Sequence, residues 1–391
     1  MLNDNRPIYL DCHATTPVDK RVVEAMLPYF SDRFGNPSST THLYGWQAES
    51  AVKQARTIIA EAINATPEEI VFTSGATEAN NLAIKGVAEA YFNQGKHIVT
   101  VATEHRAVLD PCKYLQTLGF EITFLPVKPD GLIDLEQLSA AIRPDTILVS
   151  VMAANNEIGV IQPLEKIGQI CREQEILFHS DAAQAIAKIP LDVQQMNIDL
   201  ISLTAHKVYG PKGTGALYIR RRNPRVTIAS QIQGGGQERN IRSGTLCTPQ
   251  IVGFGKAIEL GLHLMTSEQE YLLQLREKLW SILNQLPGIH LNGHPTRKLA
   301  GNLNISVEGV DGTALILGLQ PTVAVSSGSA CSAASTKPSH VLTALGMEEK
   351  LAHASIRFGI GRFNTMAEIE IVGKTVVSVI TSLRQARAFS C

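Results

Sequence analysis

The stretch that decides the fold of this chain is Leu203-Thr204-Ala205-His206-Lys207, taken together with His179-Ser180-Asp181-Ala182-Ala183-Gln184 upstream. In both stretches polar side chains follow directly after a short apolar run, residues 176–178 in one case and 200–203 in the other. An apolar run followed at once by carboxylate, amide, imidazole and amine groups is typical of a buried strand whose end opens into a ligand site.

Similar apolar runs recur between about residues 50 and 220. They cover residues 70–72, 97–101, 122–125, 146–151, 176–178, 200–203 and 216–219. These runs are short, rich in β-branched residues and without clean polar alternation, which indicates strands that are covered on both faces. The segments between them suit crossover helices. We therefore predict an α/β fold with a mainly parallel sheet between helix layers.

The length of the chain and a change of pattern after residue 250 predict two domains. A chain of 391 residues exceeds the usual size of one compact domain. Beyond residue 250 apolar residues repeat at helical spacing, from Tyr271 to Leu286, before Pro287-Gly288. We expect residues 16–262 to form a large α/β domain. Residues 1–15 and 263–391 are expected to form a smaller α+β domain that carries a loop around Cys331.

Composition and charge narrow the classes of function. The formal net charge of −1 gives no electrostatic reason to expect nucleic acid or an anionic membrane as a partner. No stretch approaches the ~18 consecutive apolar residues of a membrane span, and residues 1–6 lack the pattern of a signal peptide. None of the six cysteines lies in a Cys-x-x-Cys pair, so no resident metal site is indicated. We expect a cytoplasmic protein.

The polar groups at two strand ends indicate a pyridoxal phosphate site. Open α/β sheets bind ligands beyond the carboxyl ends of their strands, where Asp181 and Lys207 are expected. A lysine binds the aldehyde of pyridoxal phosphate as a Schiff base, and a carboxylate keeps the ring nitrogen protonated. Taken alone, Asp181 and Lys207 are weak evidence for a pyridoxal phosphate site, because charged residues are common in any protein. Residues at the ends of other strands therefore have to support this interpretation.

Three further segments carry suitable groups at expected strand ends. Residues 73–80 follow a strand and open a helix, so their small residues and Thr77 suit a phosphate cup, although a plain Ser/Thr helix cap is the alternative. His105 follows the next strand and can stack on a pyridine ring or relay protons, or serve a structural purpose. Asn156 follows a later strand and offers an amide to a hydroxyl or carboxylate, although asparagine is also common in turns.

Two segments further along the chain carry arginines. Residues 234–245 form a glycine-rich loop that contains Arg242 and Thr245, which suits a second phosphate clamp or an ordinary surface turn. Arg357 is a single cation in an apolar stretch. Because arginine binds carboxylates through two parallel hydrogen bonds, Arg357 is a candidate for the carboxylate of a substrate.

In this order the motifs carry a resemblance to a known family. The chain resembles the cysteine desulfurases of fold type I, in the class V aminotransferase-like group, over nearly its whole length. The matching motifs are residues 9–11, 14–17, 34–38, 72–78, 155–159, 325–331 and 338–342. The long segment around Cys331, Val325-Ser326-Ser327-Gly328-Ser329-Ala330-Cys331, resembles the NifS/IscS-type subgroup.

The resemblance implies a role for each candidate residue. Lys207 carries pyridoxal phosphate, Asp181 pairs with the ring nitrogen, Gln184 with the ring hydroxyl, and His105 stacks on the ring. The residues implied to hold the phosphate are Ala76, Thr77, Thr204 and His206, with Thr245 reaching in from the other subunit of a homodimer. Asn156, which also lies beside the cofactor, and Arg357 fix the carboxylate of L-cysteine. Cys331 accepts sulfur, and any metal contact is limited to transient ligation of a cluster by Cys331 with a scaffold partner.

The implied function is the conversion of L-cysteine to L-alanine with transfer of sulfur to Cys331 as a persulfide. That sulfur would supply iron–sulfur cluster assembly or other thiolation through a sulfur-acceptor protein. A selenocysteine lyase or a class V aminotransferase is the alternative, and an aminotransferase would not need Cys331. A pyridoxal-binding regulator would usually carry an added DNA-binding domain, and no segment of the 391 residues suits one.

Overall fold

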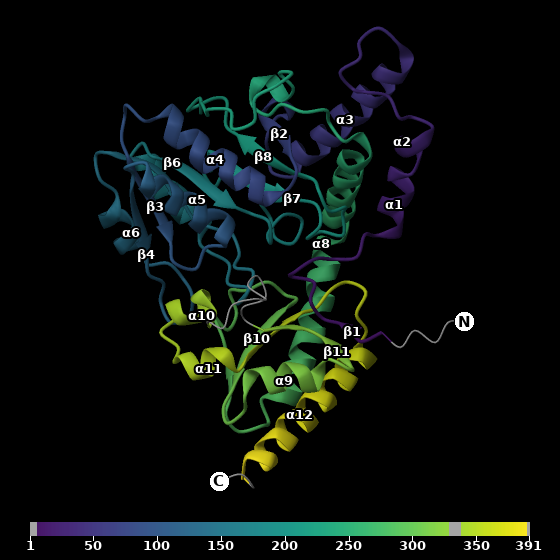
Figure 1. Ribbon diagram of the computed structural model, residues 1–391, viewed down its shortest axis with the longest axis vertical. Coiled ribbons are helices and arrows are strands. Elements are labelled where there is room, and N and C mark those ends of the chain that lie inside the picture. The colour runs from purple at the N-terminus through teal and green to yellow at the C-terminus, as the bar shows by residue number, and fades with distance from the viewer. Residues whose placement is uncertain (1–5, 328–337, 389–391) are drawn as a thin grey trace.

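The computed structural model describes residues 6–327 and 338–388. A seven-stranded sheet with the order β2-β8-β7-β6-β5-β3-β4 forms its larger part (Figure 1). The strands are β2 (Ile70–Thr73), β3 (His97–Val101), β4 (Glu121–Leu125), β5 (Thr146–Ser150), β6 (Leu177–Asp181), β7 (Leu200–Thr204) and β8 (Gly215–Ile219). The neighbours from β7 to β4 run parallel, whereas β8 runs antiparallel to both of its neighbours. The predicted mainly parallel α/β fold is confirmed.

Helices cover both faces of this sheet, which explains why its strands lack polar alternation. One face packs against α4 (Ala76–Ala90) and α5 (Arg106–Thr117) through residues such as Leu82 and Leu148. The other face packs against α3 (Leu43–Glu61), α7 (Leu164–Glu173) and the first part of α8 (Thr248–Leu283), with Phe178 and Phe254 in the shared core. Successive strand residues alternate between these two apolar layers. The short helix α6 (Leu135–Ala141) follows β4 at the sheet edge.

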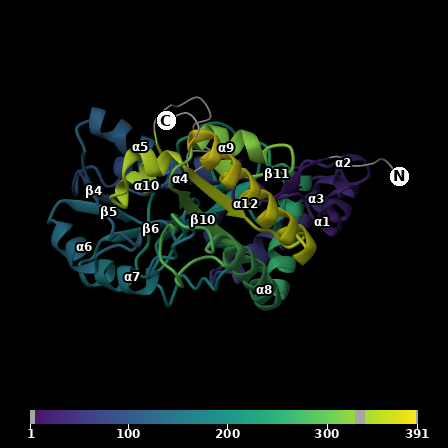
Figure 2. The same ribbon diagram turned by 90° about the horizontal axis from the view of Figure 1, so that it is seen from below.

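A smaller antiparallel sheet with the order β12-β13-β10-β9 lies at the other end of the molecule. Its strands are β9 (Ile289–Leu291), β10 (Asn302–Val307), β12 (Ser326–Ser327) and β13 (Ser355–Gly359). The helices α9 (Gly312–Leu319) and α12 (Met366–Ala388) share one core with it, and Figure 2 shows these two helices side by side. The short helices α10 (His340–Ala344) and α11 (Glu349–His353) complete this part, which confirms the predicted smaller α+β region.

The helix α8 joins the two parts because it contributes to both cores. Phe254 and Ile258 pack under the large sheet, whereas Leu275 and Leu279 pack in the small core. The sequence pattern indicated the helix only from Tyr271 onward, but the structure extends it back to Thr248. The expected division between residues 262 and 263 falls inside this helix and stays a prediction.

The N-terminal segment connects the small sheet to the end of the large sheet. The strand β1 (Ile8–Tyr9) pairs in parallel with β11 (Val323–Ala324). The Cys12 backbone N–H then donates to the Gly359 carbonyl at 2.9 Å, and the Thr16 N–H donates to the His206 carbonyl at 2.9 Å. Residues 10–16 therefore lie between β13 and the loop after β7, beside the polar strand ends.

The remaining short elements lie outside the two sheets. They are the helices α1 (Lys20–Met26) and α2 (Pro28–Ser31) and the 3-10 turns η1 (Pro67–Glu69) and η2 (Glu238–Asn240). Within residues 6–327 and 338–388, the model contains no helix with the length and apolar character needed to cross a membrane.

Candidate active site

A cavity of about 630 Å³ opens beyond the carboxyl ends of the parallel strands. That volume is in the range of small-molecule sites. The structure places ten sequence-predicted residues around it, namely Ala76, Thr77, His105, Asn156, Asp181, Gln184, Thr204, His206, Lys207 and Arg357. Thr245 is exposed and does not line this cavity, and Cys331 lies outside the described residues. One cavity thus gathers predicted residues that are up to 281 positions apart, from Ala76 to Arg357.

The N-terminus of α4 forms one end of the cavity. Gly75 precedes the helix with φ at 152°, a backbone conformation that residues with a side chain rarely adopt. A Cβ atom there would lie 3.9 Å from Thr204 Oγ1, so the hydroxyl and the helix N-terminus face the same space. The first N–H groups of a helix have no partner within the helix and carry partial positive charge. This end of the cavity is suited to a phosphate.

Two titratable side chains, Glu78 and His206, lie beside the helix N-terminus, and their surroundings shift their pKa values. Burial opposes ionisation of Glu78, but hydrogen bonds from Arg242 and Ser74 hold the pKa of this carboxyl below its ordinary value. Arg242 Nε donates to Glu78 Oε1 at 2.7 Å, so the guanidinium expected in a phosphate clamp is engaged within this chain. Burial, reinforced by the charge of Lys207, lowers the pKa of His206 to about 4, and its ring is therefore neutral.

Asp181 is held at the end of β6 by two donors. Asn80 Nδ2 donates to Asp181 Oδ2 at 2.7 Å, and the Ala183 N–H donates to Oδ1 at 2.9 Å. Glu104, fully buried nearby, accepts the Met152 N–H at 2.5 Å. Burial and the charge of Asp181 raise the pKa of Glu104 well above its ordinary value. Asp181 thus presents a carboxylate, held by two donors, that is suited to pair with a protonated ring nitrogen.

Lys207 follows β7 and reaches into the cavity. Its Nζ donates to the carbonyl of His13 and, at 2.7 Å, to the carbonyl of Ala14. Both acceptors are neutral backbone groups in the N-terminal segment. These two hydrogen bonds can be given up without leaving a charged acceptor unpaired, which suits a lysine that must bond to an aldehyde.

His105 caps the N-terminus of α5 at the cavity wall. Its Nδ1 accepts the Ala107 N–H at 3.1 Å, so the proton of the neutral ring resides on Nε2. The backbone thereby fixes both the orientation and the tautomer of the imidazole. A ring held in this way can present a face to a planar ligand and exchange a proton through Nε2.

Arg357 enters the cavity from β13 of the small sheet. Its Nη2 donates to Asp11 Oδ1 at 2.6 Å and to Ser326 Oγ at 3.0 Å, and its Nη1 donates to the Asn156 carbonyl at 3.0 Å. Only 2% of Arg357 is exposed, and its Nε finds no hydrogen-bond partner among residues 6–327 and 338–388. A buried donor without a partner is costly, so this guanidinium is poised to bind an additional anion.

The donors and the shape of the cavity fit pyridoxal phosphate. The helix N-terminus with Thr204 provides the phosphate end, Asp181 provides the carboxylate for a ring nitrogen, and Lys207 provides the amine. Arg357 is suited to the carboxylate of an amino acid. The phosphate, the ring nitrogen and the aldehyde of the cofactor would therefore each face a complementary group of this chain.

Sequence reasoning missed residues that hold the site from behind. Asn80 is the last residue of the helix-opening segment 73–80, and no role for it was predicted from the sequence. An amide in the first turns of a buried helix could have indicated a partner for a polar group of the site. Asp11 ends the matching motif at 9–11, and His13 lies between that motif and the one at 14–17. Nothing in the local sequence indicates that Asp11 binds Arg357 or that His13 binds Gln184. Glu104 directly precedes His105, and no pattern in the sequence indicated a role for it.

Comparison with known proteins identifies the family. The family model described as "Aminotransferase class-V" matches residues 8–372. The chain belongs to that family. A relative from Arabidopsis thaliana named "Cysteine desulfurase, mitochondrial" is 55% identical over 381 residues, which are 97% of this chain and 84% of the relative. "Cysteine desulfurase IscS" from Rickettsia felis is 54% identical over 384 residues, which are 98% of this chain and 93% of the relative.

Solved structures agree with this family assignment. A "NIFS-LIKE PROTEIN" superposes with a TM-score of 0.89 at 37% identity and covers 96% of this chain and 100% of that protein. "SspA in complex with cysteine" gives a TM-score of 0.82 at 43% identity over 92% of this chain and 100% of that protein. The resemblance to the NifS/IscS-type class V enzymes is confirmed, and with it pyridoxal phosphate as the cofactor of this chain.

Proposed function

We propose that this family member is a cysteine desulfurase that converts L-cysteine to L-alanine and transfers the sulfur to Cys331 as a persulfide. The observation that carries the proposal is the meeting of Lys207, Asp181 and Arg357 around one cavity, in a chain at least 54% identical to proteins named cysteine desulfurase. The alternatives, a selenocysteine lyase or an aminotransferase, are less well supported because these relatives bear neither name.

Pyridoxal phosphate, when bound, withdraws electrons from the bonds at Cα of an amino acid. Residues of this chain would orient the substrate and move its protons. Arg357 and Asn156 would bind the carboxylate of L-cysteine and so orient its Cα, since a guanidinium fixes a carboxylate in one plane. The Lys207 amine, which rests on two backbone carbonyls, would take the proton from Cα.

Sulfur transfer requires a nucleophile, and we assign that role to Cys331. Its thiolate would form an S–S bond to the sulfur of the substrate while the Cβ–S bond breaks. The electron pair of the broken bond stays with the carbon fragment, which takes up protons and leaves as alanine. His105, whose Nε2 carries the ring proton, is suited to donate a hydrogen bond to the Cys331 thiolate and so to stabilise it.

The test compares Cys331→Ala with Lys207→Ala. We expect the Cys331 variant to bind pyridoxal phosphate and L-cysteine, with the normal visible spectrum, but to produce neither persulfide nor alanine. The Lys207 variant should lose the borohydride-reducible cofactor adduct while keeping its fold. Mass spectrometry of the wild-type protein after exposure to cysteine should find one added sulfur on the peptide with Cys331. Sulfur on another cysteine, or wild-type alanine formation by Cys331→Ala, would refute the assignment.

We further infer a homodimer in which Thr245 reaches the phosphate of the other subunit. Large apolar side chains are exposed within a short stretch of the sequence, namely Leu27, Phe30, Phe34, Leu43, Tyr44 and Trp46. Such a concentration of exposed apolar side chains is typical of an interface. Thr245 itself is exposed, so it is accessible to a second copy. A monomer of full activity in analytical ultracentrifugation would contradict this part of the proposal.

The sulfur acceptor and the location complete the proposal. We infer delivery of the persulfide to an acceptor protein such as an iron–sulfur scaffold, which incubation with purified acceptors would identify by sulfur transfer. We also infer a cytoplasmic location. Cys12, Cys112 and Cys171 are buried thiols without disulfide partners, which suits a reducing compartment. Cell fractionation tests the location.

A further inference from the structure

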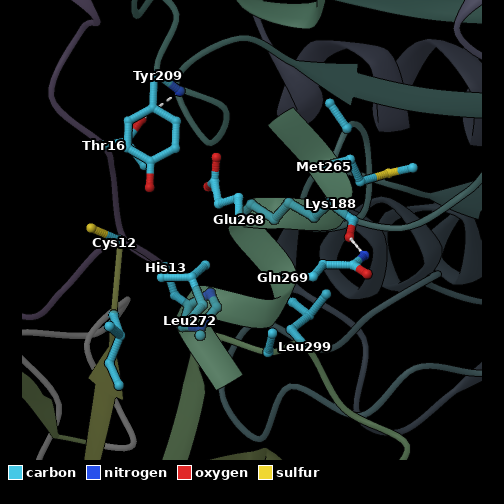
Figure 3. A pocket seen from close by; sticks show the side chains of 14 residues that line it. Cys12, His13, Thr16, Lys188, Tyr209, Met265, Glu268, Gln269, Leu272 and Leu299 are labelled. Carbon is cyan, nitrogen blue, oxygen red and sulfur yellow. Dashed lines mark hydrogen bonds between the residues drawn. The ribbon is translucent and has the colours of Figure 1, made fainter. Parts of the chain in front are cut away.

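A second cavity of about 40 Å³ shares a lining residue with the main one (Figure 3). The side chains around it include Cys12, Lys188, Tyr209 and Glu268, together with His13. His13 also lines the main cavity, so this residue separates the two spaces. Only 4% of His13 is exposed. None of the sequence motifs explains a buried histidine at this position.

The hydrogen bonds of Gln184 fix the orientation of its amide. Gln184 Nε2 donates to the His13 carbonyl at 2.9 Å, and a carbonyl can only accept. Lys188 Nζ donates to Gln184 Oε1 at 3.3 Å, and an ammonium group can only donate. The two ends of the amide are therefore assigned independently of any histidine. The second N–H of Gln184 has no partner among the hydrogen bonds of the described residues, and Gln184 lines the main cavity.

The same assignment fixes the tautomer of His13. Its Nδ1 lies 3.1 Å from Gln184 Oε1, which accepts, so Nδ1 must carry the proton. Burial, together with the positive charges of Lys188 and Arg357, holds the pKa of His13 well below its ordinary value, and the ring is neutral. Its Nε2 is then an acceptor, and it has no partner in residues 6–327 and 338–388.

The small cavity, which His13 also lines, has room for a water molecule that would donate to His13 Nε2. A space of about 40 Å³ holds ordered water when polar groups line it. Lys188, Glu268 and Tyr209 supply those polar groups. A donor on Nε2 would favour the proton on Nδ1, and with it the hydrogen bond to Gln184. A water molecule in the small cavity would therefore help His13 to hold the Gln184 amide in the main cavity.

We propose that His13 and Lys188 are positioning residues that hold the Gln184 amide with its N–H toward the ring oxygen of pyridoxal phosphate. The proposal deepens the proposed function, because it rests on Gln184 meeting that oxygen. Two donors on Oε1 also polarise the amide, which makes its remaining N–H a stronger donor. A donor at that place stabilises negative charge on the ring oxygen and lowers the affinity of the bound cofactor for a proton.

The test titrates the visible absorption of the holoenzyme against pH in the absence of cysteine. His13→Leu removes the donor to Gln184 Oε1 at similar volume. We expect the midpoint of the spectral change to rise by about 0.5 to 1 pH unit, the equivalent of one net hydrogen bond. The dissociation constant of pyridoxal phosphate should rise about threefold to tenfold by the same reasoning. His13→Ala carries the same expectation if His13→Leu does not fold.

Two controls separate positioning from a merely structural role. His13→Asn places an amide N–H near the position of Nδ1 and should restore the wild-type midpoint. Cys12→Ala changes the neighbouring residue in the same small cavity, which has no hydrogen bond to Gln184, and should leave the midpoint unchanged. The charged groups Lys188, Lys207, Arg357 and Glu268 near His13 are the same in all these variants.

The outcomes are distinct from those that test the desulfurase reaction. The positioning role would be overturned if folded His13→Leu and His13→Ala kept the wild-type midpoint. It would also be overturned if His13→Asn and Cys12→Ala shifted the midpoint as much as His13→Leu does. Those results would leave persulfide formation on Cys331 untouched. Conversely, a protein that binds pyridoxal phosphate with the expected shifts but forms no persulfide would refute the desulfurase proposal alone.

Discussion

Replacing Asn80 with alanine should reduce catalysis without removing any group that touches the substrate. Asn80 is completely buried on α4, and its Nδ2 donates to Asp181 Oδ2 at 2.7 Å. Among the described residues, the backbone N–H of Ala183 then remains as a donor to Asp181, on the other oxygen. With one oxygen released, the carboxylate can turn away from the plane in which a ring nitrogen would meet it.

The magnitude follows from the kind of hydrogen bond that is lost. A hydrogen bond to a charged, buried acceptor contributes about 1.5–3 kcal/mol. At about 1.4 kcal/mol per factor of ten, the loss corresponds to roughly a 10- to 150-fold change. We expect kcat/KM for cysteine to fall within that range. The affinity for pyridoxal phosphate should weaken by less, because the phosphate contacts and the Lys207 bond remain.

The assay measures alanine formation and cofactor binding, with Asn81→Ala as the matched control. Asn81 is the next residue on the same helix and carries the same side chain, but its Nδ2 donates only to the backbone carbonyl of Thr77. Asn81→Ala should therefore keep kcat/KM within about twofold, in keeping with the small effect of most surface substitutions. Equal losses in both variants, or wild-type kinetics in a folded Asn80→Ala, would refute the reasoning.

Two further predictions concern the small-sheet side of the cavity. Burial raises the pKa of Glu157 from 4.5 to about 7. The contribution of this group to the free energy of unfolding is therefore complete below pH 4.5 and is lost as the pH rises through about 7. Glu157→Gln should remove this loss, and equal melting-temperature profiles of both proteins from pH 4 to 8 would contradict it. Arg357→Lys should raise KM for cysteine about tenfold or more, because one ammonium group cannot keep the bonds to Asp11, Ser326 and Asn156 while binding a carboxylate; steady-state kinetics with an unchanged KM would exclude the carboxylate role.

The sheet and the general place of the site were predictable because both depend on local patterns. A strand buried on both faces has to be apolar throughout, and the first polar residue after it has to lie at the sheet edge. Asp181 and Lys207 follow β6 and β7 in this way, so their convergence needed only the rule that parallel strands end together. The antiparallel direction of β8 was not predicted, since an apolar run carries no sign of its direction.

The residues that hold the site could not be predicted, because they meet across long stretches of chain. Asp11 and Arg357 form an ion pair across 346 positions, and His13 and Gln184 are 171 positions apart. No local spacing encodes such pairs. The early part of α8 was missed for a related reason. Its residues face a large core on more than one side, so the amphipathic stripe that marks Tyr271 and later residues is absent there.

The N-terminal segment explains how two sheets form one active site. Asp11 holds the guanidinium of Arg357 at 2.6 Å, and the carbonyls of His13 and Ala14 hold the amine of Lys207 two and three residues later. An anion that binds Arg357 competes for the same guanidinium as Asp11. Any movement of Asp11 is carried over a single intervening residue to the carbonyl that holds Lys207. The proposed binding of a substrate carboxylate at Arg357 would therefore be coupled to release of the Lys207 amine through residues 11–14.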